Sequence, residues 1–83
     1  MKTTRYFTER VLLNHPEARD SARILAVLSW AIATEVQDDG RIRHWGWSLD
    51  ENGKRRIMRV ITLADGETVH NAFYDRSYER TLP

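Results

Sequence analysis

The chain has 83 residues, of which 41% are hydrophobic and 30% charged, and a formal net charge of +1, which indicates one soluble domain with a modest core. It has no cysteine, which excludes disulfides and cysteine-based zinc sites, and no apolar run approaches the ~20 residues of a membrane span. Residues 1–10 lack the apolar stretch of a signal peptide, so we expect a cytoplasmic protein with no membrane partner.

The N-terminal part of the chain predicts two helices. The first is expected over about residues 4–14, because Phe7 and Val11 lie four positions apart and Pro16 ends the helix at the preceding residue. The second is expected over about residues 20–32. Its apolar residues recur at helical spacing and form one broad stripe: Ile24, Leu25, Val27, Leu28, Ala31 and Ile32.

After Ala33 the hydrophobic pattern changes to alternation, which predicts strands. Three sequences mark turns of the kind that closes two-residue hairpins: DDG at 38–40, ENG at 51–53 and ADG at 64–66. Four antiparallel strands are therefore expected, over about residues 34–38, 41–49, 54–64 and 67–74, followed by a polar tail over 75–83. The predicted fold is a single α+β domain over residues 1–83, with both helices packed on one face of a four-stranded antiparallel meander.

Two-residue turns of type I′ would place Trp47 opposite Met58 and Trp45 opposite Val60. One face would then be the core under the helices, formed by Val36, Trp45, Trp47, Met58, Val60, Val69 and Phe73. The other face would carry polar groups on a partly apolar floor: Glu35, His44, Gly46, Ser48, Arg59, His70 and Tyr74, with Ile42, Ile57, Ile61 and Leu63 among them. A slip of one residue would exchange the two faces.

Positive charge is concentrated in the middle of the chain. Residues 41–59 hold six bases and two acids, whereas residues 1–40 hold five and six and residues 60–83 hold two and four. Eleven of the thirteen bases are arginine, the residue best suited to phosphate recognition. This distribution is typical of an RNA-binding surface, and it also fits strand edges that are simply solvated.

The sequences GRIRHWG (40–46), RV (59–60) and VHNAFYDR (69–76), in this order after two helices, resemble a family of small bacterial domains. That family is distantly similar to the BrnT and RelE-type ribonuclease toxins of toxin–antitoxin systems, and the resemblance covers about residues 5–76. It implies a RelE-like or BrnT-like fold and a toxin-like module that binds RNA or cleaves it without a metal. It also implies an acidic antitoxin as a protein partner.

Metal-independent RNA cleavage needs a base, an acid and a cation for the developing phosphorane charge. On the polar face, His44 and His70 can share the acid and base roles, Glu35 can orient His44, and Arg59 can hold a phosphate. The same residues have structural alternatives: His44 bonded to Glu35, His70 completing an edge strand, and Arg59 in an ion pair with Glu35 or Asp75.

The residues expected to contact RNA are Arg41, Arg43, Tyr74 and Arg76, with Tyr74 as a stacking partner for a base. The tail can bring Arg76, Tyr78 and Arg80 toward an RNA groove, or it can be a disordered end. The predicted strands are too spread to bring two histidines and a carboxylate around a metal, and no phosphate-loop sequence is present, so we expect neither a metal nor a cofactor.

A second hypothesis is a non-enzymatic interaction domain that binds another protein through its sheet face or its edge strands. The first and fourth strands are both predicted to lie at edges. Strand addition by a partner, or a homodimer through an edge strand, is therefore available to either of them.

Overall fold

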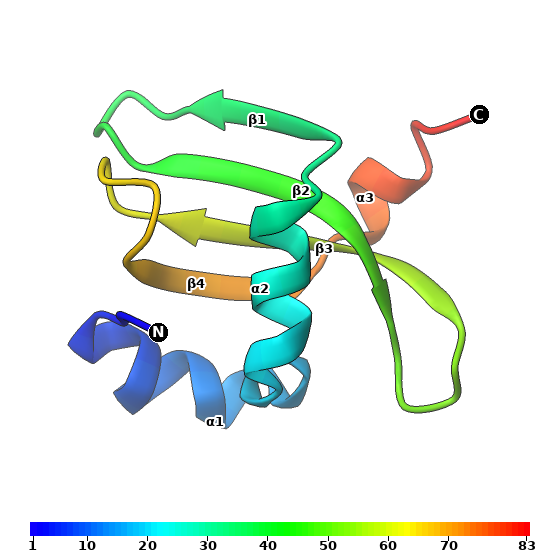
Figure 1. Cartoon of the computed structure of the whole chain (residues 1–83), viewed down its shortest axis with the longest axis horizontal. Coiled ribbons are helices and arrows are strands. Elements are labelled where there is room, and N and C mark those ends of the chain that lie inside the picture. The colour runs from blue at the N-terminus through cyan, green and yellow to red at the C-terminus, as the bar shows by residue number, and fades with distance from the viewer.

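Four antiparallel strands form one sheet in the order of the chain, with helical segments before and after them (Figure 1). The structure is a computed structural model that describes residues 1–83. Its elements are η1 (Phe7–Val11), α1 (Leu12–Asn14), η2 (Pro16–Arg19), α2 (Ser21–Ser29), β1 (Ala33–Val36), β2 (Ile42–Leu49), β3 (Arg55–Thr62), β4 (Val69–Tyr74) and α3 (Arg76–Glu79). The α+β class and the four-stranded antiparallel sheet are confirmed. None of the helices combines the length and the apolar character needed to cross a membrane.

The helices differ from the sequence prediction mainly at their ends. The first helical run reaches Asn14 as predicted, but its middle, η1, has π-helical hydrogen bonding. A short 3₁₀ segment, η2, then begins at Pro16. The Asp20 side chain caps α2 by accepting the Ala22 N–H at 3.0 Å, and α2 ends at Ser29, three residues before the predicted end.

Each hairpin turn places only its glycine in the left-handed region, with φ of 87° at Gly40, 75° at Gly53 and 71° at Gly66. A type I′ turn needs positive φ at two successive residues, so the predicted turn type is wrong. In the middle turn the Gly53 N–H donates to the Asp50 carbonyl at 3.0 Å and the Asp50 N–H donates to the Lys54 carbonyl at 2.9 Å. Three residues therefore separate the paired positions instead of two. The Asp50 carboxylate stabilises this wider loop by accepting the Lys54 N–H at 2.9 Å.

The wider turns move the strand register by one residue. Trp47 lies opposite Ile57 instead of Met58, and the β1–β2 pairing is displaced in the same way. Between β3 and β4 the pairing starts with Thr62 opposite Val69, and a bulge at Ile61/Thr62 then shifts the remaining pairs. The predicted register is therefore wrong along most of the sheet. The residues of β2 exchange faces relative to β3, whereas Met58 and Val60 stay under the helices as predicted.

On β2 the small residues face the helices and the tryptophans face away. Gly46, opposite Met58 on β3, lies directly under α2, where an added Cβ would come within 3.2 Å of the Val27 Cα. A glycine at this position lets the helix backbone approach the sheet closely. The expectation that Trp45 and Trp47 belong to the core under the helices is thus wrong.

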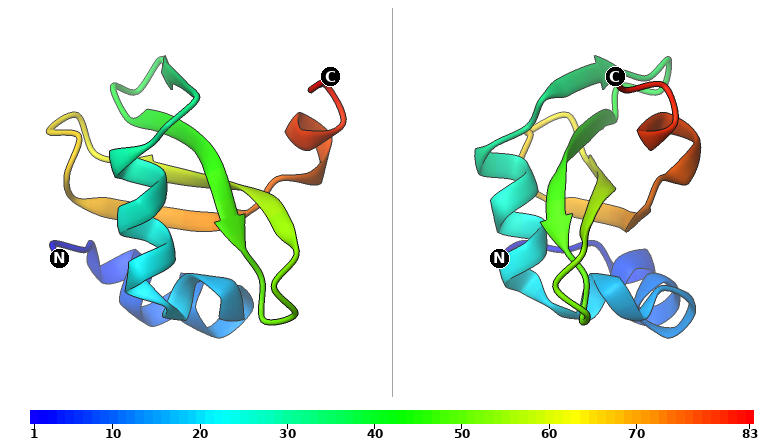
Figure 2. Two further views of the ribbon diagram at one scale, coloured as in Figure 1. Left: turned by 45° about the vertical axis from the view of Figure 1, so that its right-hand side comes forward. Right: turned by 90° about the vertical axis from the view of Figure 1, so that its right-hand side faces the viewer.

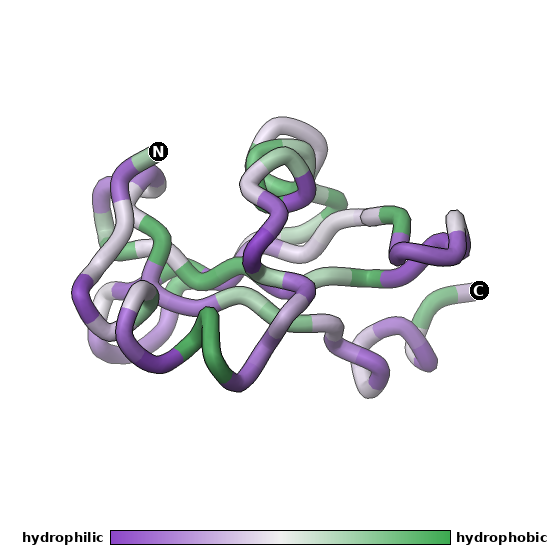
Figure 3. The backbone as a smooth tube through the Cα atoms, turned by 90° about the horizontal axis from the view of Figure 1, so that it is seen from below, coloured by the Kyte–Doolittle hydropathy of each residue, from purple (hydrophilic) through white to green (hydrophobic).

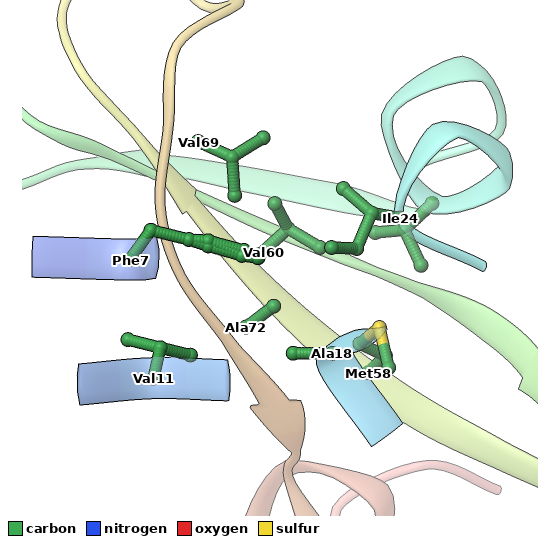
Figure 4. Close-up of a cluster of buried hydrophobic side chains, with 9 residues drawn as sticks. Phe7, Val11, Ala18, Ile24, Met58, Val60, Val69 and Ala72 are labelled. Carbon is green, nitrogen blue, oxygen red and sulfur yellow. The ribbon is translucent and has the colours of Figure 1, made fainter. Parts of the chain in front are cut away.

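The core under the helices is assembled from the first helical segments, α2 and four positions of the sheet (Figure 4). Its side chains point toward one another from both layers and exclude water, which is the main stabilising contribution in a domain of this size. The cluster comprises nine buried residues: Phe7, Val11, Ala18, Ile24, Val27, Met58, Val60, Val69 and Ala72.

The predicted tail contains a helix, α3, on the opposite side of the sheet from α2 (Figure 2, right). Asp75 caps it by accepting the Tyr78 N–H at 2.9 Å, and the Asp75 N–H donates to the Ile57 carbonyl at 2.9 Å, which anchors the helix to β3. The hydropathy colouring in Figure 3 marks most of this segment as hydrophilic, in keeping with the polar tail expected from the sequence, but the segment is helical over Arg76–Glu79.

Candidate functional site

His44 lies on the face of the sheet that the helices cover. It is only 9% exposed, and its Nε2 is 2.9 Å from the Thr62 Oγ1, which is itself fully buried. Burial lowers the pKa of His44, so the neutral imidazole is favoured. This histidine therefore satisfies its hydrogen bonding inside the protein and is closed off from a substrate.

His70 lies beside the β-bulge of β4, against the N-terminal segment. Its Nδ1 is 2.9 Å from the Thr4 Oγ1, and the Tyr6 ring stacks on it with centroids 4.8 Å apart. Burial, with a contribution from the nearby Arg41 charge, lowers the pKa of His70. His70 and His44 thus have separate partners, and the structure does not bring them to a common site.

Glu35 and Arg59 lie on the face opposite His44. Glu35 is paired with Arg43 in the strand register, and its Oε1 accepts a hydrogen bond from the Arg43 guanidinium at 2.6 Å, so it does not orient His44. The predicted catalytic set of His44, His70, Arg59 and Glu35 is therefore not assembled. The cause is the one-residue register shift, which places alternate residues on opposite faces.

Arg59 belongs to a polar cluster centred on the Asp75 carboxylate. One oxygen of Asp75 accepts hydrogen bonds from the Trp45 Nε1 at 3.0 Å and from the Arg59 Nε at 2.9 Å, and lies 2.6 Å from a terminal Arg59 nitrogen. The Tyr78 ring stacks on Trp45 with centroids 4.6 Å apart, and the Phe73 ring lies 5.0 Å from the Arg59 guanidinium carbon. The ion pair with Asp75, one of the structural alternatives, is thus what the structure contains.

The electrostatics of the cluster favour an ionised Asp75. Its side chain is 4% exposed, and burial by itself raises the pKa of a carboxyl group. The hydrogen bonds from the Tyr78 N–H, Trp45 and Arg59, together with the Arg59 charge, outweigh burial and hold the pKa of Asp75 below its usual value. The cluster joins α3 to the sheet and engages the Arg59 Nε and one terminal Arg59 nitrogen with Asp75.

The four residues predicted to contact RNA do not form one surface. Arg41 sits at the first turn, 3.4 Å from an Asp39 carboxylate oxygen, and Arg43 is two-thirds buried beside the sheet. Tyr74 faces the helical layer, where burial raises the pKa of its phenol and its hydroxyl has no hydrogen-bond partner. Only Arg76, on α3, is exposed and without an ion pair.

The feature that the sequence prediction missed is the exposed pair of Trp47 and Arg55 on neighbouring strands. The Arg55 guanidinium carbon lies 4.2 Å from the centroid of the Trp47 ring, which is the geometry of a cation–π contact. Trp47 is 36% exposed, and Arg55 makes no salt bridge. Assigning both tryptophans of β2 to the core concealed this pair, although the high arginine content of residues 41–59 did indicate the region.

Beside this pair, a cleft of about 570 Å³ separates the N-terminal half of α2 from the end of β2. Ser48 lines it with a buried hydroxyl that has no hydrogen-bond partner. The full lining is Asp20, Ala22, Arg23, Ala26, Trp47, Ser48, Leu49, Asp50 and Arg55. The cleft therefore combines an indole, two guanidinium groups and an unsatisfied hydroxyl.

The two carboxylates of the cleft already have partners. Asp20 caps α2 and lies 3.8 Å from Arg23, whereas Asp50 lies 3.7 Å from Arg56 and accepts backbone N–H groups of its turn. These hydrogen bonds, with the Lys54 N–H as the largest influence, lower the pKa of Asp50. Arg55 is the cleft's one charged side chain without an ionic partner, so the uncompensated charge there is positive. No group of three or more histidine, aspartate or glutamate side chains is arranged to hold a metal ion.

No family model, curated protein or solved structure matches this chain. A relationship to the RelE and BrnT toxins is therefore a hypothesis from the sequence. The function must be argued from the geometry and charge of the Trp47–Arg55 pair and its cleft.

Proposed function

We propose that this protein binds single-stranded RNA at the Trp47–Arg55 pair and the adjoining cleft. The observation that carries the proposal is an exposed indole with an unpaired guanidinium over its face. Nucleobases stack on such rings regardless of sequence, and arginine contributes both stacking and phosphate contacts. In this arrangement a base stacks against Trp47 while Arg55 turns to the adjacent phosphate.

The surrounding charges support the same surface. The hairpin that joins β2 and β3 carries Lys54 next to Arg55, and Lys54 makes no salt bridge. On the other wall of the cleft, the Arg23 guanidinium lies 3.8 Å from Asp20, a distance that leaves its remaining donors for a second phosphate.

The proposal concerns binding. None of the residues that line the cleft is a histidine, and both candidate histidines are bonded elsewhere, so a two-histidine cleavage mechanism has no support at this position. An acidic antitoxin would be attracted to the same cationic hairpin and would compete with RNA for it. In a toxin-like role, RNA and the antitoxin would therefore bind the same surface of this protein in turn.

The test is fluorescence anisotropy with a labelled single-stranded RNA of about ten nucleotides, measured at low and at physiological salt. Replacing Trp47 with Ala is expected to remove about 1–3 kcal/mol of binding free energy, roughly a 5- to 150-fold increase in Kd. Trp30→Ala is the matched control, because Trp30 is 80% exposed and does not line the cleft. Arg55→Glu is compared with Arg10→Glu, which introduces the same charge on the first helical segment.

If Arg55→Glu and Arg10→Glu weaken RNA binding equally, the attraction depends only on net charge, and the proposed site is contradicted. The absence of binding at low salt by the unmodified chain would contradict RNA binding altogether. Quenching of Trp47 fluorescence by RNA, lost in the Trp47→Ala variant and retained in the Trp30→Ala variant, is the expected sign of stacking.

A further inference from the structure

The two edges of the sheet differ in whether their backbone groups are already used. At β4 the N-terminal segment forms a parallel bridge through Thr3 and Val69, with the Thr4 N–H donating to the Val69 carbonyl and the Val69 N–H to the Lys2 carbonyl, both at 2.9 Å. Farther along β4, the Tyr74 N–H donates to a side-chain oxygen of Glu17 at 3.2 Å. The chain itself therefore already uses backbone groups of Val69 and Tyr74 on the outer edge of β4.

The outer edge of β1 has no such cover. β1 pairs only with β2, and the Gln37 N–H bonds inward to the Arg41 carbonyl at 2.7 Å. Because pairing alternates along an antiparallel strand, Ala33 and Glu35 also point their backbone groups inward, and Thr34 points its N–H and C=O outward together with Val36. An exposed edge of this kind is a template for another strand.

Apolar side chains surround this edge. Val36, at the end of β1, is 68% exposed, and Ile32, directly before β1, is 47% exposed. Trp30, the C-cap residue of α2 three positions before β1, is 80% exposed. The strand contains neither lysine nor proline, the residues that commonly block pairing at an edge. Exposed apolar residues around an open edge indicate a surface that is covered when the protein is assembled.

We propose that β1 pairs antiparallel with β1 of a second copy of this chain, with Thr34 opposite Thr34 of the other copy. Two symmetric registers are available: one centred on Thr34, which pairs the outward N–H and C=O of Thr34 in the two copies, and one centred on Glu35, which pairs Thr34 of each copy with Val36 of the other. The Ile32 N–H bonds inward to the Trp45 carbonyl at 2.8 Å, so the first register forms fewer hydrogen bonds. The second places two carboxylates directly opposite each other, which is unfavourable. The register centred on Thr34 places Glu35 opposite Ala33, which avoids repulsion between the two carboxylates. It also brings Val36 of one copy next to Ile32 of the other, which buries apolar surface. Both effects favour this register.

A second copy is the occupant that this edge fits best because the strand complements itself about a two-fold axis. Each copy then contributes the same small and apolar residues to both halves of the interface. β1 lines no part of the cleft beside Trp47, so this inference does not depend on RNA binding. Dimerisation would join two four-stranded sheets into one continuous sheet of eight strands.

The chain has no cysteine, so a single introduced cysteine reports the register directly. Thr34→Cys is expected to form a disulfide-linked dimer under mild oxidation on the order of tenfold faster than Leu13→Cys, because pairing raises the effective thiol concentration. Leu13 is the matched control, since it is 73% exposed and lies on α1. Faster crosslinking of Glu35→Cys than of Thr34→Cys would overturn the proposed register.

Sedimentation of the unmodified chain over a concentration series tests the dimer without a covalent link. Val36→Lys is expected to raise the dimer dissociation constant on the order of tenfold or more, because it places a charge within the apolar contact. Leu13→Lys, a substitution at an equally exposed apolar residue, is expected to leave the constant unchanged. A chain that sediments as a monomer up to millimolar concentration would overturn the proposal, and so would equal effects of the two lysine variants.

Discussion

The two faces of the sheet are buried by different means. On the face toward α2, apolar side chains such as Met58 and Val60 pack against the helices, and Gly46 lets the helix backbone come close. On the opposite face, α3 covers only part of the sheet, and its contact depends on Asp75 and the rings of Trp45 and Tyr78. One layer is therefore held by water exclusion over a large area, and the other by a few directed polar and aromatic contacts.

This difference explains where the protein can offer a binding surface. Beyond the short α3, nothing covers the end of β2, so Trp47 and Arg55 stay accessible there. Under the helices even a histidine, His44, is sealed and internally bonded. Substituting residues on one face at a time measures how much each face contributes to stability.

The largest expected effect comes from truncating adjacent residues of β3 that point to opposite faces. Met58 and Ile57 are both fully buried, Met58 under the helices and Ile57 on the face of α3. Met58→Ala is expected to lower the free energy of unfolding by about 2–5 kcal/mol, because the packed helices cannot close the cavity. Ile57→Ala is expected to cost less, since a four-residue helix can settle into the space. Urea denaturation of both variants measures the difference, and a larger loss for Ile57→Ala would reverse the comparison.

The next effect concerns Asp75, which organises the face of α3. Asp75→Asn leaves the Arg59 guanidinium without its counter-charge, and a loss of about 2–3 kcal/mol is expected at pH 7, less than for a fully buried pair because Arg59 is a quarter exposed. Asp38→Asn is the control, since Asp38 is exposed and has no ion pair. A loss no greater than that of Asp38→Asn would show that the cluster contributes little.

The same substitution has a predicted signature in acid. Folding lowers the pKa of Asp75, so the ionised carboxylate adds to the free energy of unfolding at any pH above the unfolded pKa of about 3.9. This contribution is lost as the pH falls from there through the pKa of Asp75 in the folded protein. Asp75→Asn should therefore flatten the decline in stability below about pH 4. Part of the decline should persist, because the pKa of Asp65 is also lowered, to about 2, by its hydrogen bonds to Thr68. Stability measured by urea titration at a series of pH values provides the check.

The smallest of these effects is expected at Gly46. Gly46→Ala inserts a Cβ 3.2 Å from the Val27 Cα, so α2 must shift by a few tenths of an ångström, at an expected cost of about 1 kcal/mol. A double-mutant cycle with Val27→Ala measures whether the two positions are coupled, since that variant removes a Cγ1 that lies 3.3 Å from the added atom. Additive effects would mean that the close approach of helix and sheet does not limit packing.

Much of the fold could be predicted, whereas most of the candidate site could not. The two N-terminal helices, the four strands in meander order and the positions of the turns follow from apolar spacing and from Gly40, Gly53 and Gly66. The pairing of Arg59 with Asp75 was one of two structural alternatives. The predicted catalytic set is not assembled because it depends on the register. The register depends on whether each of the first two turns contains two residues or three, and between β3 and β4 on the bulge at Ile61/Thr62.

Local chemistry along the chain thus determined the order and kind of elements, since helical spacing, alternation and turn glycines act over a few neighbouring residues. Only the tertiary structure decided which side chains share a face. Three-residue loops replace two-residue loops in the first two turns, with Asp50 stabilising the second, a bulge shifts the pairing of β4, and α2 requires a small residue beneath it. Those choices depend on packing between segments far apart in the sequence, and that packing placed the indole of Trp47 at the surface and the imidazole of His44 inside.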